Sequence, residues 1–328
     1  MNMKKAMVGI VTAATLCGTI AAPAMADDAE YKVLIGCSNQ AQSFYSWLAN
    51  SIKKEIDENY SDMTATINDL AGETGNVQTM IELAETGGYN GIIVNAPDET
   101  KFTDAYKEAL DEYGIYTVRV NKSEDADGVT VDLGLNNYGL GKAIGEVASE
   151  SLPENASILI LGGPAGNVGS DDRLNGFKDA LKDAGRDDVT ILAEQNAKDW
   201  QKESGMTVME DWTQMYDEDQ FDALMAPNDD LACGAIEVCE AAGWDTQRIQ
   251  FYGIDGLANG CNAVKSGAME ATVLQDCDEQ AKEAVKALHE MLTGENTESR
   301  YIELEPTLIT KDNVDEIIAK HEANGMMK

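Results

Sequence analysis

The stretch FDALMAPNDDLACGA, Phe221–Ala235, contains an apolar run, then one amide and two carboxylate side chains, and then a helical pattern. The apolar run predicts a buried strand, and a helix is predicted after it from Leu231 to Ala242. Asp and Asn are the usual N-cap residues of helices. Capping explains Asp229 and Asp230 about as well as a functional role does, and explains Asn228 less well. The ends of the other predicted strands are needed to decide between the two.

The same alternation of short apolar runs and longer amphipathic stretches repeats along the chain. The apolar runs predict strands at 31–36, 91–95, 115–120, 157–162, 189–194, 221–227 and 249–255. The amphipathic stretches predict helices that include 46–58, 76–87 and 281–292. This alternation indicates βαβ units and an α/β fold with doubly wound parallel sheets. The chain of 328 residues is long enough for two lobes, and the segment Asp127–Gly139 is the best candidate for a first crossing between them.

The first 26 residues are typical of a secretory signal peptide. MNMKK is a basic start, an apolar segment follows, and Ala24–Ala26 is a small-residue cleavage site. The exported chain is expected to begin at Asp27 and to be periplasmic or secreted. Cys17 raises the alternative of a lipid anchor, but its neighbours do not match a lipobox. No later apolar run approaches the ~18 residues of a membrane helix.

The charge of the chain excludes some partners. It has 24 basic and 59 acidic residues, a net charge of −35, which becomes −37 once Lys4 and Lys5 are removed with the signal peptide. A chain of this charge repels phosphate backbones, so nucleic acid is not an expected partner.

The cysteines and histidines do not predict a metal site. Five cysteines remain after the signal peptide, and their odd number and irregular spacing define no disulfide framework, although one disulfide is possible. With only His289 and His321, zinc is not expected. We expect neither a metal nor a cofactor.

Nearly every predicted strand ends in a planar polar or aromatic side chain. In a doubly wound sheet, ligands bind beyond the carboxyl ends of the strands. The residues at these ends are Gln42, Phe44, Tyr45, Asn95, Asn121, Lys122, Arg173, Trp200, Asn228, Asp255 and Gln275.

The chemistry of these side chains favours a small polyhydroxylated ring. Amide, carboxylate and guanidinium groups offer paired hydrogen-bonding atoms that suit neighbouring hydroxyls. Aromatic side chains offer flat apolar faces to the ring.

Several segments, in their order along the chain, resemble a known family. They are SFYSWLANSIKKE (43–55), NVQTMIELAETGGYNGIIVNAPD (76–98), VNK (120–122), NDDLACGA (228–235), GIDG (253–256) and SGAMEATVLQDCDEQAKEA (266–284). The chain is similar to the periplasmic sugar-binding proteins of the ribose and galactose/glucose type, which feed ABC transporters. The resemblance implies two lobes joined by three crossings, near 134–137, 276–277 and 305–307. The first lobe would contain 27–134 plus 277–305, and the second 135–276 plus 306–328.

The resemblance also implies roles for the residues at the strand ends. Phe44 and Trp200 would stack on a sugar, with Tyr45 completing the first aromatic pair. Hydrogen bonds would come from Gln42, Asn95, Asn121, Lys122, Arg173, Asn228, Asp255 and Gln275, while Asp229 would cap its helix. The implied partners are a monosaccharide and a membrane ABC permease, with a chemoreceptor or sensor kinase as an alternative, and the protein is expected to be a monomer.

Two departures leave the identity of the ligand open. Gln42 and Gly169 stand where galactose/glucose binders have acids, so a nucleoside, a cyclitol or a furanose signal remains an alternative to a common sugar. The segment Glu124–Gly128 resembles a calcium loop, but Gly134 occupies the position of its bidentate Glu, so calcium is not expected there.

Enzyme motifs are not supported. The segment Gly139–Gly145 has the wrong spacing for a dinucleotide fingerprint and is better explained by helix packing. There is no Gly-x-Ser-x-Gly elbow, and neither histidine lies at a predicted strand end. Asp255 is the only acid among the implied contacts, so a carboxylate pair for glycoside hydrolysis is not expected. A repressor of the same fold would carry a DNA-binding segment where this chain has its signal peptide.

Overall fold

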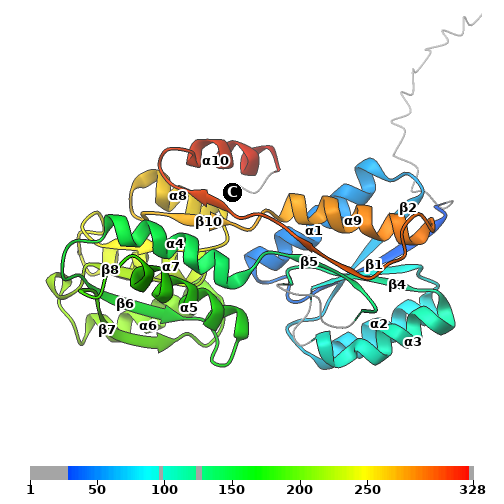
Figure 1. Cartoon of the computed structure of the whole chain (residues 1–328), viewed down its shortest axis with the longest axis horizontal. Helices are drawn as coiled ribbons and strands as arrows, with labels where there is room; N and C mark the ends of the chain where they lie inside the picture. The colour runs from blue at the N-terminus through cyan, green and yellow to red at the C-terminus, as the bar shows by residue number, and fades with distance from the viewer. Residues whose placement is uncertain (1–28, 96–98, 123–127, 325–328) are drawn as a thin grey trace, which may run out of the picture.

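The computed structural model describes residues 29–95, 99–122 and 128–324, which form two α/β lobes side by side (Figure 1). The signal peptide, Cys17 and most of the candidate calcium loop Glu124–Gly128 lie outside the described residues. Within the described part of the chain, no helix is long and apolar enough to cross a membrane.

The first lobe is built on a six-stranded parallel sheet with the strand order β11-β5-β4-β3-β1-β2. Its strands are β1 (Tyr31–Cys37), β2 (Met63–Asp69), β3 (Gly91–Asn95), β4 (Tyr116–Arg119), β5 (Val131–Gly134) and β11 (Arg300–Glu303). Its helices are α1 (Ser43–Asn59), α2 (Gly75–Gly87), α3 (Thr103–Tyr113, preceded by the 3-10 turn η1, Glu99–Phe102) and α9 (Cys277–Leu292).

Helices cover both faces of this sheet because successive strand residues point to opposite faces. Val33 and Ile35 of β1 belong to the apolar cluster that contains residues of α1 and α9. Leu34, between them, belongs to the cluster that contains residues of α2 and α3. The strands buried on both faces are therefore nearly continuous apolar runs, which made them recognisable in the sequence.

The second lobe has a four-stranded parallel sheet with the order β7-β6-β8-β9, next to an antiparallel pair, β10 and β12. Its strands are β6 (Ser157–Gly162), β7 (Thr190–Asn196), β8 (Ala223–Met225), β9 (Gln250–Tyr252), β10 (Thr272–Leu274) and β12 (Thr307–Ile309). Its helices are α4 (Asn137–Ser151), α5 (Val168–Asp183), α6 (Lys202–Thr213), α7 (Asp229–Ala241), α8 (Ala258–Ser266) and α10 (Val314–Ala323), with a 3-10 turn, η2 (Glu218–Gln220), between α6 and β8.

Glycines allow α4 and α5 to pack closely. A Cβ atom at Gly141 would lie 1.7 Å from the carbonyl oxygen of Arg173, and one at Gly176 would lie 2.1 Å from that of Tyr138. These distances leave no room for a side chain, which confirms helix packing as the role of Gly141 and, with an added Cβ 2.6 Å from atoms of Ala180 and Phe177, of Gly145, but not of Gly139. The same contact fixes the segment of α5 that carries Arg173.

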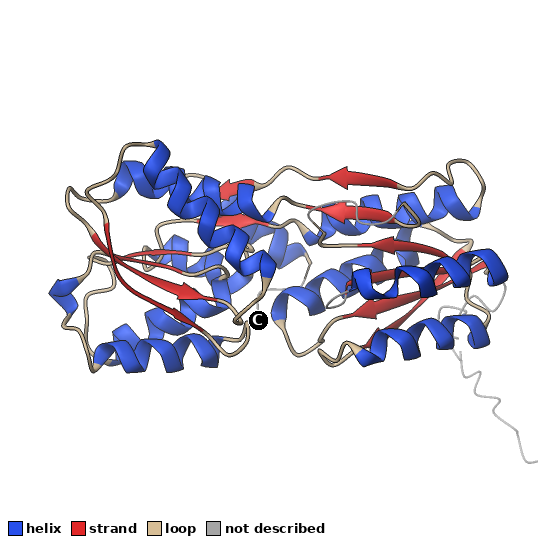
Figure 2. Cartoon of the chain, turned by 60° about the horizontal axis from the view of Figure 1, so that its bottom comes forward, coloured by secondary structure: helices blue, strands red, loops and turns tan. Residues whose placement is uncertain are grey.

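The chain crosses between the lobes three times, as predicted. It leaves the first lobe after β5, returns between β10 and α9, and leaves again between β11 and β12. These short connections run along one side of the molecule (Figure 2). Gln275 and Asp276 form the second crossing, so a residue predicted for the site lies in a segment that joins the lobes.

Several strands of the sheets, among them β2, β11 and β12, are not in the set predicted from the sequence. Strand β2 lies at the sheet edge, and its alternation of polar and apolar residues follows from having only part of its surface covered. Strand β12 runs antiparallel to β10 because it follows the third crossing and not a covering helix.

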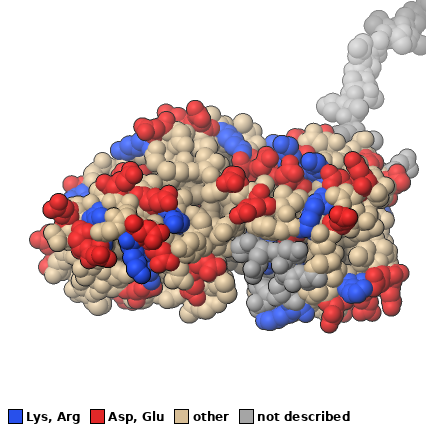
Figure 3. Space-filling view, in the orientation of Figure 1, with Lys and Arg blue, Asp and Glu red and all other residues tan. Residues whose placement is uncertain are grey.

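The acidic residues lie mainly on the surface of both lobes, with fewer basic residues between them (Figure 3). Among the acids that the structure describes, only Asp132, Asp229 and Asp255 are buried. Asp132 on β5 lies opposite Arg119 on β4, and the two side chains form a bidentate pair with distances of 2.6 and 2.5 Å. Both side chains are fully buried.

We predict that Asp132→Ala strongly destabilises the protein. The substitution leaves the buried Arg119 guanidinium without its carboxylate, and such a change typically lowers the free energy of unfolding by about 3–5 kcal/mol. Urea unfolding of the exported chain, Asp27 to Lys328, measures this. The control is Asp57→Ala, which removes the exposed pair with Lys53 and should cost less than about 1 kcal/mol. Equal losses in the two variants would contradict the prediction.

Candidate functional site

A cavity of about 370 Å³ lies between the lobes. Its walls come from the start of α1, the end of β4, the N-terminal parts of α5 and α7, the loops after β7 and β9, and the second crossing. The lining residues are Gln42, Ser43, Phe44, Tyr45, Asn121, Arg173, Trp200, Asn228, Asp230, Asp255 and Gln275.

The cavity brings together most of the side chains that the strand-end pattern singled out. Gln42, Phe44, Tyr45, Asn121, Arg173, Trp200, Asn228, Asp255 and Gln275 all line it. Their convergence follows from topology, because the carboxyl ends of parallel strands share one edge of each sheet.

Asn95 and Lys122 do not line the cavity. Asn95 ends β3, where its Nδ2 donates to the carbonyl of Val120 at 3.3 Å, and its Oδ1 is buried without a hydrogen-bond partner among the described residues. The backbone of Lys122 is held close to β5, since its N–H donates to Leu133 and a Cβ at Gly134 would lie 2.1 Å from its carbonyl oxygen. Strands β3 and β4 end beside the cavity, but the side chains of Asn95 and Lys122 are not part of its lining.

Arg173 and Asp255 form the polar floor of the cavity. Arg173 Nη1 lies 3.3 Å from Asp255 Oδ1 and donates to the carbonyl of Pro227 at 2.8 Å. Arg173 Nε donates to Asn137 Oδ1 at 2.9 Å. Gln275 Nε2 donates to Asp255 Oδ1 at 2.6 Å, while Gln275 Oε1 is buried without a hydrogen-bond partner in the described structure. Gln275 is also a lining residue of the cavity, so a polar acceptor without a partner lies in the wall of the site.

Two of the lining residues have backbone conformations that favour glycine. Asp255 has φ of 119° and Asn121 has φ of 58°. The conformation of Asp255 costs of order 1–3 kcal/mol and persists where surrounding contacts impose it, often at functional sites. The backbone hydrogen bonds of Asp255 to Val273 and Gln275 provide such contacts. They aim its carboxylate at Arg173 and Gln275.

The capping assignment for Asp229 is wrong, and capping, one of the two alternatives left open for Asp230, is not its role either. Asn228 is the N-cap of α7, and its Oδ1 accepts from the N–H of Leu231 at 2.9 Å. Asp229 instead accepts from the N–H of Leu257 at 2.7 Å and from the hydroxyl of Thr272 at 2.6 Å. Its buried carboxylate therefore joins α7 to the loop after β9 and to β10. The sequence could not distinguish these roles because any of the three side chains can cap a helix.

Asn228 also helps to place Trp200. Its Nδ2 donates to the carbonyl of Trp200 at 3.0 Å. The indole ring lies against Gly163, where an added Cβ would be 2.8 Å from the ring, and the Arg173 guanidinium carbon is 5.8 Å from the ring centre. The ring is thus fixed at the cavity wall as an apolar face.

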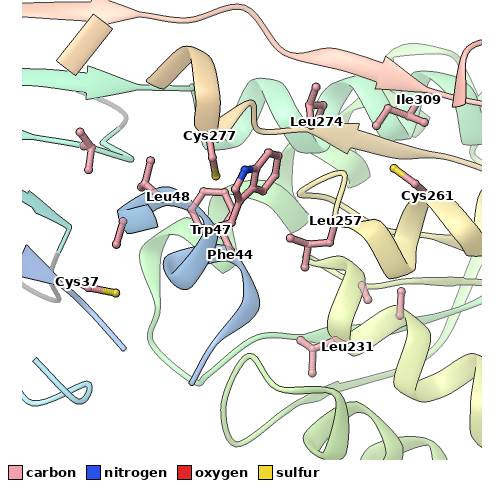
Figure 4. Packing of buried hydrophobic residues seen from close by; sticks show 14 of the residues in the cluster. Cys37, Phe44, Trp47, Leu48, Leu231, Leu257, Cys261, Leu274, Cys277 and Ile309 are labelled. Atoms are coloured by element: carbon pink, nitrogen blue, oxygen red, sulfur yellow. The ribbon is translucent and has the colours of Figure 1, made fainter. Parts of the chain in front are cut away.

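The aromatic pair of α1 belongs to an apolar cluster that extends across both lobes. Phe44 and Tyr45 meet edge to face, with ring centres 5.8 Å apart. Figure 4 shows Phe44 and Trp47 of the first lobe near Leu231 and Leu257 of the second. Contact between the lobes next to the cavity is therefore apolar.

Two lining residues, Ser43 and Asp230, were not predicted for the site. Asp230 lies in the first turn of α7 and accepts from Asn259 Nδ2 at 2.7 Å. Ser43 is the first residue of α1 in the opposite lobe. Their position in the sequence could have identified them. The first turn of a helix that follows a strand lies at the same edge of the sheet as the end of that strand.

Burial dominates the electrostatics of the three acids near the cavity. It raises the pKa of Asp255 to about 6, although Arg173 and Gln275 act in the opposite direction. Burial also raises the pKa of Asp229, with a further contribution from the Asp255 charge, and the pKa of Asp230. Within the described residues, no group of three or more His, Cys, Asp or Glu side chains could hold a metal ion. The arrangement suits hydrogen bonding to a small polar molecule between aromatic faces.

Comparison with known proteins agrees with this geometry. Residues 33–296 match the family described as the periplasmic binding protein domain. The chain is 28% identical to the ribose import binding protein of Salmonella typhimurium, over 92% of this chain and 97% of that protein. It is 27% identical to a xylitol-binding protein of Mycolicibacterium smegmatis, over 76% of this chain and 68% of that protein.

Among solved structures, the chain is similar to an ABC transporter solute binding protein from Bacillus halodurans with bound myo-inositol. The TM-score is 0.79 at 25% identity, and the match covers 90% of this chain and 99% of that chain. The two-lobed α/β fold predicted from the sequence is confirmed by this likeness and by the sheets described above.

We predict a pH dependence of stability that is specific to Asp255. Its pKa of about 6 in the folded protein lies above its ordinary value of 3.8, so the folded state binds more protons than the unfolded state between these values. The free energy of unfolding should therefore fall as the pH rises from about 4 to about 6, by at most about 3 kcal/mol from this group. Urea unfolding of the protein without ligand at pH 4.5 and pH 7 measures the change.

The matched variant is Asp255→Asn, which cannot titrate. The difference in stability between pH 4.5 and pH 7 should shift in this variant by the contribution of Asp255, together with its effect on the neighbouring Asp229, while the exposed acids contribute equally to both proteins. An unchanged difference would contradict the assigned pKa.

Proposed function

Because the chain belongs to the periplasmic binding protein domain family, we propose that it captures a monosaccharide or a similar small polyol between its lobes and delivers it to a membrane ABC importer. The relatives named above are binding proteins for ribose, xylitol and myo-inositol. These three ligands share several neighbouring hydroxyls and no charge. A nucleoside or a furanose signal of similar size is the alternative ligand.

The observation that carries this proposal is the convergence of paired polar groups and aromatic faces on one small cavity. Asp255 offers carboxylate acceptors, Gln275 Oε1 offers a buried acceptor without a partner in the described structure, and Arg173 and Asn228 offer donors. Phe44 and Trp200 add apolar faces on opposite sides. Hydroxyls both donate and accept, so a polyol can satisfy donors and acceptors in the same cavity.

Hinge closure is the proposed mechanism. Residues 27–134 plus 277–305 would move as one body against 135–276 plus 306–328, with the change in backbone angles confined to the three crossings. A ligand that bonds to Asn121 in one lobe and to Arg173 and Asp255 in the other favours the closed state by its differential affinity. The position of Gln275 in the second crossing supports this coupling, because it connects ligand contact with a hinge segment.

The proposal gives the site no catalytic step. Asp255, one of the two acids in the lining, is already bonded to Arg173 and Gln275 and so acts as a hydrogen-bond acceptor. Export to the periplasm, action as a monomer and delivery to a permease belong to the same proposal. Docking of the loaded protein on a chemoreceptor or sensor kinase is the second candidate, since it uses the same closed state.

The direct test is a thermal-shift panel on the chain from Asp27, without added metal. The probes are D-ribose, D-glucose, D-galactose, xylitol, myo-inositol and adenosine. Ligand at 100 times its Kd stabilises a protein by about 2.7 kcal/mol, so one or two probes should raise the Tm by several degrees. A rise with adenosine alone, or with no probe, would remove the sugar assignment.

We predict that Asp255→Ala weakens binding of the best probe by about 100-fold or more. The change removes a buried carboxylate acceptor, and charge-assisted hydrogen bonds of this kind are worth about 1.5–3 kcal/mol each. The fold should persist, because Arg173 keeps its bonds to Asn137 and Pro227. Isothermal titration calorimetry measures the Kd, and circular dichroism checks the fold.

The control for this prediction is Asp211→Ala, on the exposed face of α6. It removes the same charge away from the cavity and should leave the Kd unchanged. Wild-type affinity in the Asp255→Ala protein would refute the site.

A further inference from the structure

Asp230 is a half-buried carboxylate in the cavity wall, and its hydrogen bond from the described residues comes from a neutral group. Asn259 Nδ2 donates to it at 2.7 Å, and Ser43 of the other lobe lines the same cavity. Neither side chain carries a charge. The nearest cation that acts on it, Lys202, is paired with Glu237 on the same helix as Asp230.

The other charges of the cavity do not offset Asp230. Arg173 is the one cation among the lining residues. Its Nε and Nη1 groups donate to the Asn137 side chain, the Pro227 carbonyl and Asp255. Asp255 and Arg173 therefore neutralise each other, and Glu203 adds negative potential at Asp230. The described lining has a net charge of −1, centred on Asp230.

We propose that Asp230 selects the ligand by charge: the cavity accepts neutral polyols and polyols with a protonated amine, and it rejects sugar acids and sugar phosphates. This inference rests on the proposed function, since it concerns the class of polyol that the same cavity takes. Both hydroxyl and ammonium groups donate hydrogen bonds to a carboxylate. A carboxylate or phosphate on the ligand has no proton to donate at neutral pH and repels Asp230 in a medium of low dielectric constant.

Two sources of repulsion act on an anionic ligand: the carboxylate of Asp230 in the cavity, and the electrostatic field of the whole acidic chain. The net charge of −35 repels every anion at long range, and the acidic residues on the surface contribute to this field (Figure 3). Interactions between exposed charges are screened beyond about 8 Å at an ionic strength of 0.15 M. Selection by Asp230 should persist at 0.5 M KCl, whereas repulsion by the surface should weaken.

The experiment measures the Kd of two sets of probes by isothermal titration calorimetry at 0.15 and 0.5 M KCl. One set is scyllo-inositol, scyllo-inosamine and scyllo-inositol phosphate, and the other is D-glucose, D-glucosamine and D-glucuronate. All positions of scyllo-inositol are equivalent, so the site of its substituent is not a variable. The proteins are the wild type, Asp230→Asn, and the matched control Asp211→Asn.

The expected result is that the wild type binds the anion of a set at least about 100-fold more weakly than the neutral probe, and the amine at least as tightly. Asp230→Asn should reduce this discrimination at least about 10-fold at both salt concentrations, and Asp211→Asn should leave it unchanged. Anion binding equal to neutral binding in the wild type would overturn the proposal. Equal discrimination by the wild type and Asp230→Asn would also overturn it, even if sugar binding itself is established.

A second measurement tests the charge argument if none of the six probes binds, an outcome that would count against the proposed function alone. Burial raises the pKa of Asp230, so its ionised form is disfavoured in the folded protein, and removing the charge should stabilise the protein without ligand. Asp230→Asn should therefore have a higher Tm than the wild type at pH 7, and Asp211→Asn should not. A lower Tm for Asp230→Asn would mean that its carboxylate is compensated and would overturn the inference.

Discussion

The guanidinium of Arg173 is the group on which the candidate site depends. It joins the start of α4 through Asn137, the loop before α7 through Pro227, and the loop after β9 through Asp255. A buried guanidinium is tolerated only when its donors are paired, so these three segments are held in one arrangement. The absence of a side chain at Gly141 lets α4 approach α5 at the carbonyl of Arg173 itself. Helix packing and site geometry are thus consequences of the same contact.

Three consecutive residues of α7 show how burial assigns different tasks to similar side chains. Asn228 caps the helix and holds the backbone of Trp200. Asp229 points inward and joins the loop after β9 to β10. Asp230 faces the cavity. Asp229 and Asp230 follow one another in the first turn of the helix, where side chains point about 100° apart, so the interior receives one and the cavity wall the other, while Asn228 precedes them as the N-cap.

The second crossing links the candidate site to the orientation of one lobe relative to the other. Gln275 bonds to Asp255 in the second lobe and leads directly into α9, which packs in the first lobe. Ser43 and Asp230, from opposite lobes, line the same cavity. A ligand in this position touches groups whose separation depends on lobe orientation, which is the physical requirement for ligand-dependent closure.

The sequence by itself determined the architecture and most of the cavity lining. Buried parallel strands must be apolar along their length, and polar groups at their carboxyl ends converge because the strands are parallel. Both patterns are local and could be recognised without coordinates, which is why Arg173, Trp200, Asn228, Asp255 and Gln275 were identified. Edge strand β2 was missed because partial burial leaves a weaker pattern.

The tertiary structure alone decided how each polar side chain is used. It placed Asn95 and Lys122 outside the lining, gave the cap to Asn228, and turned Asp230 toward the cavity. These outcomes depend on which distant donors lie within about 3 Å, such as Thr272 for Asp229 and Asn259 for Asp230. A sequence pattern specifies the direction of a strand or helix, but the partner of a side chain on it comes from another segment whose position only packing determines.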